Sequence, residues 1–233
     1  MKKIMFNDRY GLTQAVLSGR KTMTRRVITC PKTFKGEWIA GFHVYKRQSD
    51  GAILEWPCMY DADERDFDGG QILPKFKIGE VVAIAQSYKD LGYHPAALDR
   101  SPNDWRVVRG ILGQSKGWNN KMFVRADACQ NHIRITNVRV EKLQDISDED
   151  CIQEGVVKRD HIIPTPTQQI IPQYFPCQYM IDCVAKVGWG RVYDTPREAF
   201  ADLIDKVSGK GTWYSNPYVF VYEFELVKGC RRK

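Results

Sequence analysis

The sequence predicts an α+β protein, built on a small β-barrel or curved sheet with short helices at its ends. Residues 132–143 and 218–226 alternate between apolar and polar side chains, which is typical of half-buried strands. The helical patterns are short, and long irregular connections join them to the strands. No other segment has enough periodic apolar character for a second core, so we expect one domain over residues 1–233. We expect it to carry insertions near residues 31–74, 91–120 and 157–194.

The N-terminal part predicts a short strand followed by a short helix. Residues 3–6 are suited to a strand, and Asn7 or Asp8 can cap the helix that follows. Gly19 then ends this helix. The apolar positions that share one face of the helix are Leu12, Ala15 and Val16.

The middle of the chain predicts two strands separated by a loop. Residues 81–85 are continuously apolar and predict a buried strand, whereas residues 91–120 have the composition of a loop. The strand at 132–143 has a shift in its alternation, which predicts a β-bulge near Thr136 and Asn137.

Two capping boxes predict the later helices. Ser147 to Asp150 opens a short helix that ends at Gly155, and Thr195 to Glu198 opens a longer one that Gly209 ends. Pro196 stands at the first position of the longer helix, where its missing N–H costs nothing. The apolar stripe of this helix consists of Phe200, Leu203, Ile204 and Val207.

Positive charge is concentrated between Arg9 and Gly36, a span without Asp or Glu. The span holds seven Lys and Arg residues, and the chain carries a net charge of +7, so the remaining residues are balanced. Such a region attracts a phosphate-bearing ligand, although a solvated basic loop is the simpler interpretation of charge alone. The densest part is Gly19 to Arg26.

Composition argues against several classes of protein. The longest apolar runs are too short for a membrane span, and the N-terminus lacks a signal peptide's apolar region, so we expect a cytoplasmic protein with no membrane partner. Seven cysteines without paired C-x-x-C spacing support neither a disulfide framework nor a zinc site. Cys129 and His132 are spaced like half of a metal site, but no second half follows. We expect no metal and no cofactor.

Several segments together resemble the ASCH domain, a PUA-like β-barrel family associated with RNA recognition and RNA-related chemistry. They cover both ends and the middle of the chain and leave the expected insertions unmatched. The segments are Val16 to Thr22, Lys77 to Glu80, Ile135 to Glu141, Leu143 to Ser147, Glu154-Gly155, Trp213, Asn216-Pro217 and Val219 to Phe224.

The resemblance also implies candidate catalytic residues. In the family signature G-x-K-x-x-E-x-R, Gly19, Lys21 and Arg26 match, but Thr24 stands where Glu is expected. A bacterial branch that is similar in having Thr at this place hydrolyses N4-acetylcytidine with a Lys, a Thr and a downstream Glu. The resemblance places these roles on Lys21, Thr24 and Glu154. A further departure is Ala85-Gln86, where many relatives have Arg-Glu.

Amide hydrolysis suits these three side chains. Thr24 can act as a hydroxyl nucleophile if Lys21 takes its proton, and the neighbouring arginines favour a neutral Lys21. Glu154, near a helix C-terminus, is expected to have a cation nearby. Lys21 and Thr24 share a pocket only if the backbone from Gly19 to Thr24 is irregular, because strand side chains alternate. The alternatives are a buried structural Thr24, exposed Lys21 and Arg26, and a Glu154 that is solvated or paired with Lys158 or Arg159.

Arg20, Arg25, Arg26, Trp213 and Tyr214 are the candidates for binding RNA or a modified nucleoside, since arginines bind phosphates and aromatic rings stack on bases. The favoured function is amide hydrolysis on an N4-acylated cytidine or a similar nucleoside. The alternatives are a non-catalytic RNA-binding module and a metal-independent ribonuclease with Lys21 and Glu154 as acid and base. No protein partner is identifiable.

Overall fold

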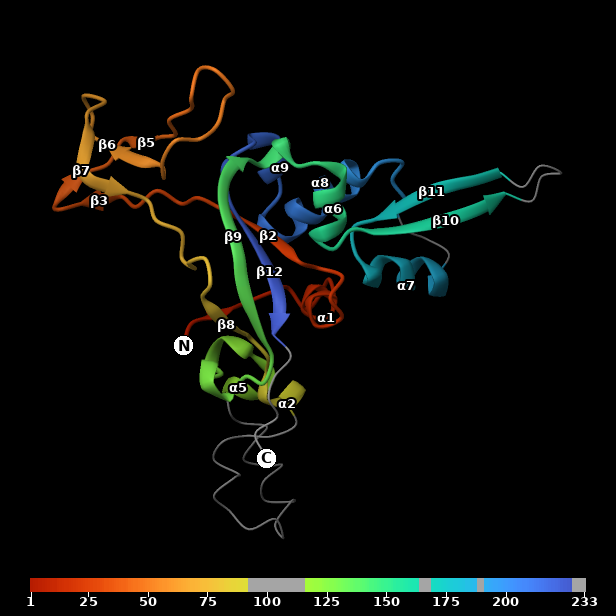
Figure 1. Cartoon of the computed structure of the whole chain (residues 1–233). Helices are drawn as coiled ribbons and strands as arrows, with labels where there is room; N and C mark the ends of the chain where they lie inside the picture. Colours follow the sequence, from red (N-terminus) through yellow and green to blue (C-terminus); the bar gives the residue numbers. More distant parts are fainter. Residues whose placement is uncertain (92–115, 164–168, 188–190, 228–233) are drawn as a thin grey trace, which may run out of the picture.

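The protein has an α+β fold, as the sequence predicts. The computed structural model describes residues 1–91, 116–163, 169–187 and 191–227. Two long curved strands, β9 (His132–Lys142) and β12 (Tyr218–Val227), run through the centre of the molecule (Figure 1). Smaller elements surround them at both ends.

The main sheet has five strands. Its first two strands are parallel and the other neighbours are antiparallel. The strands, in spatial order, are β1 (Lys3–Ile4), β8 (Val81–Ile84), β9, β12 and β2 (Met23–Val27).

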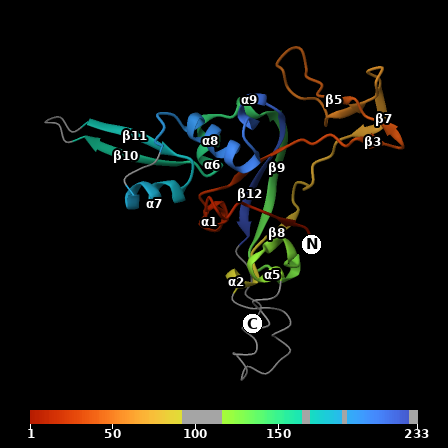
Figure 2. The ribbon, with the colours of Figure 1, turned by 180° about the vertical axis from the view of Figure 1, so that it is seen from behind.

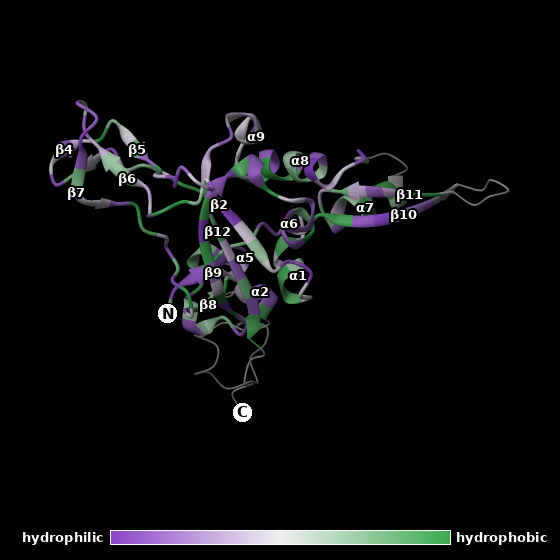
Figure 3. Ribbon diagram, turned by 45° about the horizontal axis from the view of Figure 1, so that its top comes forward, coloured by the Kyte–Doolittle hydropathy of each residue, from purple (hydrophilic) through white to green (hydrophobic). Residues whose placement is uncertain are grey.

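The two central strands lie where the alternating pattern of the sequence predicts them. Hydrophobic and hydrophilic residues alternate along β9 and β12 (Figure 3). In β9 every second residue on either side of the bulge is buried, as Ile133 and Ile135 are. The register shifts between Glu223 and Phe224, which face Asn137 and Ile135, so Thr136 is the extra residue. The predicted bulge is therefore confirmed.

The sheet is open and curved. Among the described residues, its order ends at β1 on one side and at β2 on the other, so the strands do not form the closed barrel that was one of the two expected forms. The two ends nevertheless approach each other, because Nη2 of Arg26 in β2 donates a hydrogen bond of 2.5 Å to the carbonyl of Met5, next to β1. Met5 and Arg26 both line a cleft at this place.

Three helices cover this cleft and the neighbouring face. They are α1 (Leu12–Leu17), α6 (Asp148–Gln153) and α8 (Pro196–Ser208). Both predicted N-cap residues cap their helices: Ser147 Oγ accepts from the backbone N–H of Asp150, and Thr195 Oγ1 accepts from that of Glu198. Phe200, Leu203 and Ile204 of α8 are buried in the main core.

The segments expected to be insertions contain secondary structure outside the main sheet. Residues 31–74 form two small sheets on one side, and residues 157–163 and 169–187 form two paired antiparallel strands with a helix on the other (Figure 2). The elements of the first segment are β3 (Thr33–Phe34), β4 (Glu37–Trp38), β5 (Gly41–His43), β6 (Cys58–Tyr60) and β7 (Asp66–Gln71); those of the second are β10 (Val157–Ile163), β11 (Gln169–Phe175) and α7 (Gln178–Val187).

One local prediction was wrong, and another was wrong at its described edges. Helix α1 begins after Gly11, which has a left-handed φ of 67°, and Asn7 and Asp8 precede it rather than cap it. The expected loop at 91–120 lies mostly outside the described residues, but its edges are helical, because α2 (Tyr88–Leu91) ends at Leu91 and α5 (Lys116–Asn119) begins at Lys116.

The remaining short helices are η1 (Lys121–Phe123), η2 (Ala126–Ala128), η3 (Leu143–Asp145) and α9 (Thr212–Ser215). Within the described ranges, no helix has the length and apolar character needed to cross a membrane.

Candidate active site

Lys21 lies in an irregular turn between α1 and β2. Gly19 adopts a φ of +75°, which is the left-handed region that favours glycine, and the backbone N–H of Lys21 then bonds to the carbonyl of Ala15. Strand β2 begins only at Met23. The prediction of irregular backbone is thus right for Gly19 to Thr22 and wrong for Thr24, which lies within the strand.

Glu154 lies at the C-terminal end of α6, directly beside this turn. The backbone N–H of Thr22 donates to the carbonyl of Gln153 at 3.0 Å, and Lys21 Nζ donates to the carbonyl of Glu154 at 2.6 Å. The turn after α1 therefore satisfies carbonyl groups that the helix end leaves without partners. Gly155 continues the chain at a φ of +111°, and a Cβ there would lie 3.3 Å from Leu12 Cδ2 and 3.7 Å from Lys21 Cδ.

The side chains of Lys21 and Glu154 form a buried ion pair. Nζ of Lys21 lies 2.5 Å from Oε2 of Glu154, and the two side chains are only 2% and 5% exposed. Burial lowers the pKa of the Lys21 ammonium, an effect that the Glu154 carboxylate opposes and that Arg26 and Arg25 reinforce. The cation expected near Glu154 is Lys21, together with Arg25, and not Lys158 or Arg159.

Thr24 faces the cleft from the middle of β2. In the register of the sheet it stands opposite Tyr222, and alternation places it on the face opposite to that of Met23 and Arg25. It is 5% exposed, and its hydroxyl makes no hydrogen bond to any other residue that the structure describes. This hydroxyl is therefore available to a ligand in the cleft.

Lys21, Thr24 and Glu154 line one pocket at the place where the ends of the sheet approach each other. Its cavity volume is about 40 Å³, which is room for a few water molecules or one small chemical group. One wall is polar, and the opposite wall is apolar and comes from α8. The other lining residues are Met5, Phe6, Asn7, Leu12, Arg25, Arg26, Phe200, Leu203, Ile204, Val207 and Ser208.

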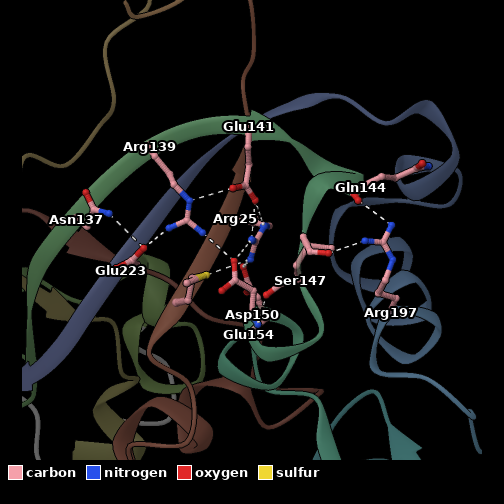
Figure 4. Close-up of polar contacts among 12 residues, drawn as sticks. Arg25, Asn137, Arg139, Glu141, Gln144, Ser147, Asp150, Glu154, Arg197 and Glu223 are labelled. Carbon is pink, nitrogen blue, oxygen red and sulfur yellow. Dashed lines mark hydrogen bonds and ion pairs between the residues drawn. The ribbon is translucent and has the colours of Figure 1, made fainter. Parts of the chain in front are cut away.

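A network of ion pairs extends from Glu154 through Arg25 to side chains of β9 and α6 (Figure 4). Nη1 of Arg25 lies 3.3 Å from Oε1 of Glu154, and Nη2 of Arg25 lies 2.6 Å from Glu141 and from Asp150. Arg139 continues the network to Glu223 and also contacts Glu141 and Asp150. Burial opposes the charge of Arg25, but the three carboxylates together raise its pKa. Arg25 therefore remains charged in a buried position.

The predicted ligand-binding residues are not all at the pocket. Arg25 and Arg26 line it, whereas Arg20 is exposed and does not. Trp213 and Tyr214 belong to α9 and are not among the lining residues; Trp213 packs against Phe200, and Tyr214 is 91% exposed. The structure thus brings the three catalytic candidates together but leaves the aromatic pair outside.

Sequence reasoning missed an aromatic wall of the pocket and the partners of Arg25. Phe6 is buried, and its ring centroid lies 6.0 Å from Lys21 Nζ and 5.8 Å from Arg26 Cζ. The place of Phe6 within residues 3–6, where a strand was expected, was a signal that it contributes to the core. The partnership of Arg25 with Glu141 and Asp150 had no local signal, because more than one hundred residues separate them along the chain.

The described residues contain no group of three or more His, Cys, Asp or Glu side chains placed to hold a metal ion. Cys129 is buried, and its thiol donates to the carbonyl of Arg125 at 3.6 Å.

Comparisons of the chain with protein-family models, with curated proteins and with solved structures found no match.

Proposed function

We propose that this protein is an amidohydrolase that removes the acyl group from an N4-acylated cytidine or a similar modified nucleoside. The observation that carries the proposal is the meeting of Lys21, Thr24 and Glu154 in one pocket. These three residues come from a turn, a strand and a helix end, respectively, and the resemblance to ASCH-domain amidohydrolases assigns catalytic roles to the same three.

The contacts of Lys21 suit a general base. A neutral lysine amine has two N–H donors and one lone pair. The two contacts with Glu154, to Oε2 and to the backbone carbonyl, use both donors and leave the lone pair for the proton of the Thr24 hydroxyl. The lowered pKa of Lys21 favours this neutral form.

In the proposed reaction, Thr24 Oγ1 attacks the acyl carbon while Lys21 accepts the hydroxyl proton. The bond between the acyl carbon and the exocyclic nitrogen then breaks, and Lys21 returns the proton to that nitrogen. Water hydrolyses the resulting ester of Thr24. Arg26, which also lines the pocket, supplies positive charge for the oxyanion that forms on the acyl oxygen.

The size of the pocket supports a small acyl group. A cavity of about 40 Å³ has room for a group of a few atoms next to Lys21. The methyl end of an acetyl group suits the apolar wall of Phe200, Leu203 and Ile204, and the base and sugar lie at the mouth. We also propose, from the same resemblance, that the open sheet is a variant of the PUA-like fold. In this variant the hydrogen bond from Arg26 to the carbonyl of Met5 joins the two ends of the sheet, which a closed barrel would join by strand pairing.

RNA binding without catalysis has less support. Arg25, at the centre of the basic span, is neutralised internally by Glu154, Glu141 and Asp150, and the ammonium of Lys21 is paired with Glu154. These charges do not attract phosphate groups as solvated charges do. The ribonuclease alternative uses the same Lys21 and Glu154 pair and leaves the hydroxyl of Thr24 without a role.

The test is to incubate the protein with N4-acetylcytidine and to measure cytidine and acetate by chromatography. We expect turnover in the wild type and at least about a hundredfold loss in Lys21→Ala and Thr24→Val. Thr24→Ser, which keeps a hydroxyl, should retain part of the activity. Thr33→Val and Lys35→Ala, at exposed positions in and beside the outlying β3, are matched controls. An inactive wild type, or full activity in Thr24→Val, would reject the proposal.

A further inference from the structure

Glu154 contacts two different environments. Its Oε2 pairs with Lys21 in the pocket, while its Oε1 pairs with Arg25, whose side chain is fully buried and also contacts Glu141 and Asp150. The register explains this arrangement: Arg25, Arg139 and Glu141 share one face, and Thr24 and Arg26 share the other. The carboxylate of Glu154 therefore joins the pocket to the ion-pair network.

The position of Arg25 is fixed independently of Glu154. Its Nε and Nη2 both donate to Oε1 of Glu141, at 2.8 and 2.6 Å, and Nη2 also donates to Asp150. Nη1, the remaining nitrogen of the guanidinium, points to Glu154 and to the sulfur of Met23. A guanidinium held by two carboxylates is a rigid support for a third one.

We propose that Arg25 is a positioning residue: it orients the Glu154 carboxylate toward Lys21 and offsets part of its negative charge, so that Lys21 can release a proton. Glu154 stabilises the charged ammonium of Lys21, and a cation on the other oxygen of the same carboxylate weakens this stabilisation. The charged groups that face Lys21 are Glu154 from the end of α6 and Arg25 and Arg26 from β2. Helix α8 and residues 5–7 contribute only uncharged groups to the pocket.

This inference rests on the proposed function where it concerns catalysis, but its first test does not need activity. The titration of Lys21 can be followed by the ¹³Cε chemical shift in the full-length protein, with Lys21→Met used to assign the signal. Arg25→Gln removes the positive charge beside Glu154, so the midpoint of the Lys21 titration should move to higher pH. Arg134→Gln, which removes a cation from an exposed pair with Glu225, is the matched control and should leave the midpoint unchanged.

Glu141→Gln provides a test in the opposite direction. Without the Glu141 charge, Arg25 acts more strongly on Glu154, so the midpoint should move to lower pH. This variant decides the question if Arg25→Gln does not fold. Arg25→Lys keeps the charge but loses the planar donor group, so it should lower kcat for N4-acetylcytidine with little change in the midpoint.

The kinetic prediction is a shift of the acid limb of the pH–rate profile. At a pH on that limb, Arg25→Gln should lower kcat on the order of tenfold, as expected for a unit charge removed at short range in a protein interior. An unchanged or lower midpoint in folded Arg25→Gln, or an unchanged or higher one in Glu141→Gln, overturns the inference. A wild type without hydrolase activity whose midpoint shifts as described would reject the proposed function and leave the inference on Lys21 standing.

Discussion

The substitution Glu154→Gln tests the buried ion pair most directly. It removes the negative charge that lies 2.5 Å from Lys21 and 3.3 Å from Arg25, while it nearly preserves the shape of the side chain. Arg25 keeps two other carboxylates, Glu141 and Asp150. Lys21, by contrast, loses its one carboxylate contact among the described residues.

The burial of the pair sets the expected magnitude. An exposed ion pair contributes about 0–1 kcal/mol, whereas removal of one partner of a buried pair costs about 3–5 kcal/mol because a desolvated charge remains. Lys21 and Glu154 are 2% and 5% exposed, so the larger range applies. We therefore expect Glu154→Gln to lower the free energy of unfolding by about 3–5 kcal/mol at pH 7.

Urea unfolding followed by circular dichroism measures this change. Lys21→Met combined with Glu154→Gln should be less destabilised than Glu154→Gln alone, since no unpaired ammonium remains. The loss in Glu154→Gln should also decrease as pH rises, because Lys21 then releases its proton. Glu225→Gln, in the exposed pair with Arg134, is the control and should cost about 1 kcal/mol or less. A loss below about 1 kcal/mol in Glu154→Gln would refute the reasoning, because it would equate the buried pair with an exposed one.

Three further predictions concern Lys21, the pocket wall and the helix end. The pKa of Lys21 in the folded protein lies below 10.5, so at pH values between the folded and unfolded pKa the unfolded chain binds more protons than the folded one. The free energy of unfolding should therefore rise with pH through that window. Urea unfolding at several pH values measures this rise, and Lys21→Met should flatten it. Leu203→Ala should enlarge the pocket and raise kcat/KM for N4-butyrylcytidine relative to N4-acetylcytidine. Leu226→Ala, at an exposed strand position, is the control. An unchanged ratio of the two kcat/KM values in Leu203→Ala would contradict the proposal that Leu203 contacts the acyl group. Gly155→Ala, at a φ of +111° and beside Leu12, should lower the free energy of unfolding by about 1–3 kcal/mol, and a neutral effect would show that the turn can relax.

The elements that the sequence predicted well depend on short-range patterns. The alternation in 132–143 and 218–226, the bulge at Thr136 and the N-caps Ser147 and Thr195 involve residues close together in the chain. The start of α1 was misplaced because two good capping residues, Asn7 and Asp8, precede the actual first turn by several positions. The choice of Gly11 depends on how the turn packs, and propensity alone does not decide it.

The candidate site divides in the same way. Lys21, Thr24 and Glu154 were recognised from motifs, and the structure brings them to one pocket. Trp213 and Tyr214 were selected because aromatic rings can stack on bases, but they belong to α9 and do not line the pocket. Composition identifies such residues without indicating where they face.

The sequence by itself determined the α+β class, the two long strands and the irregular turn at Gly19, because each follows from local periodicity or from backbone conformation. Only the tertiary structure decided that the basic span is not a uniform surface for phosphate. Folding buries Arg25 among carboxylates from β9 and α6, and it buries Lys21 against Glu154. The physical reason is that the cost of desolvating a charge depends on partners distant in the chain, and these are fixed only when the sheet and α6 pack together.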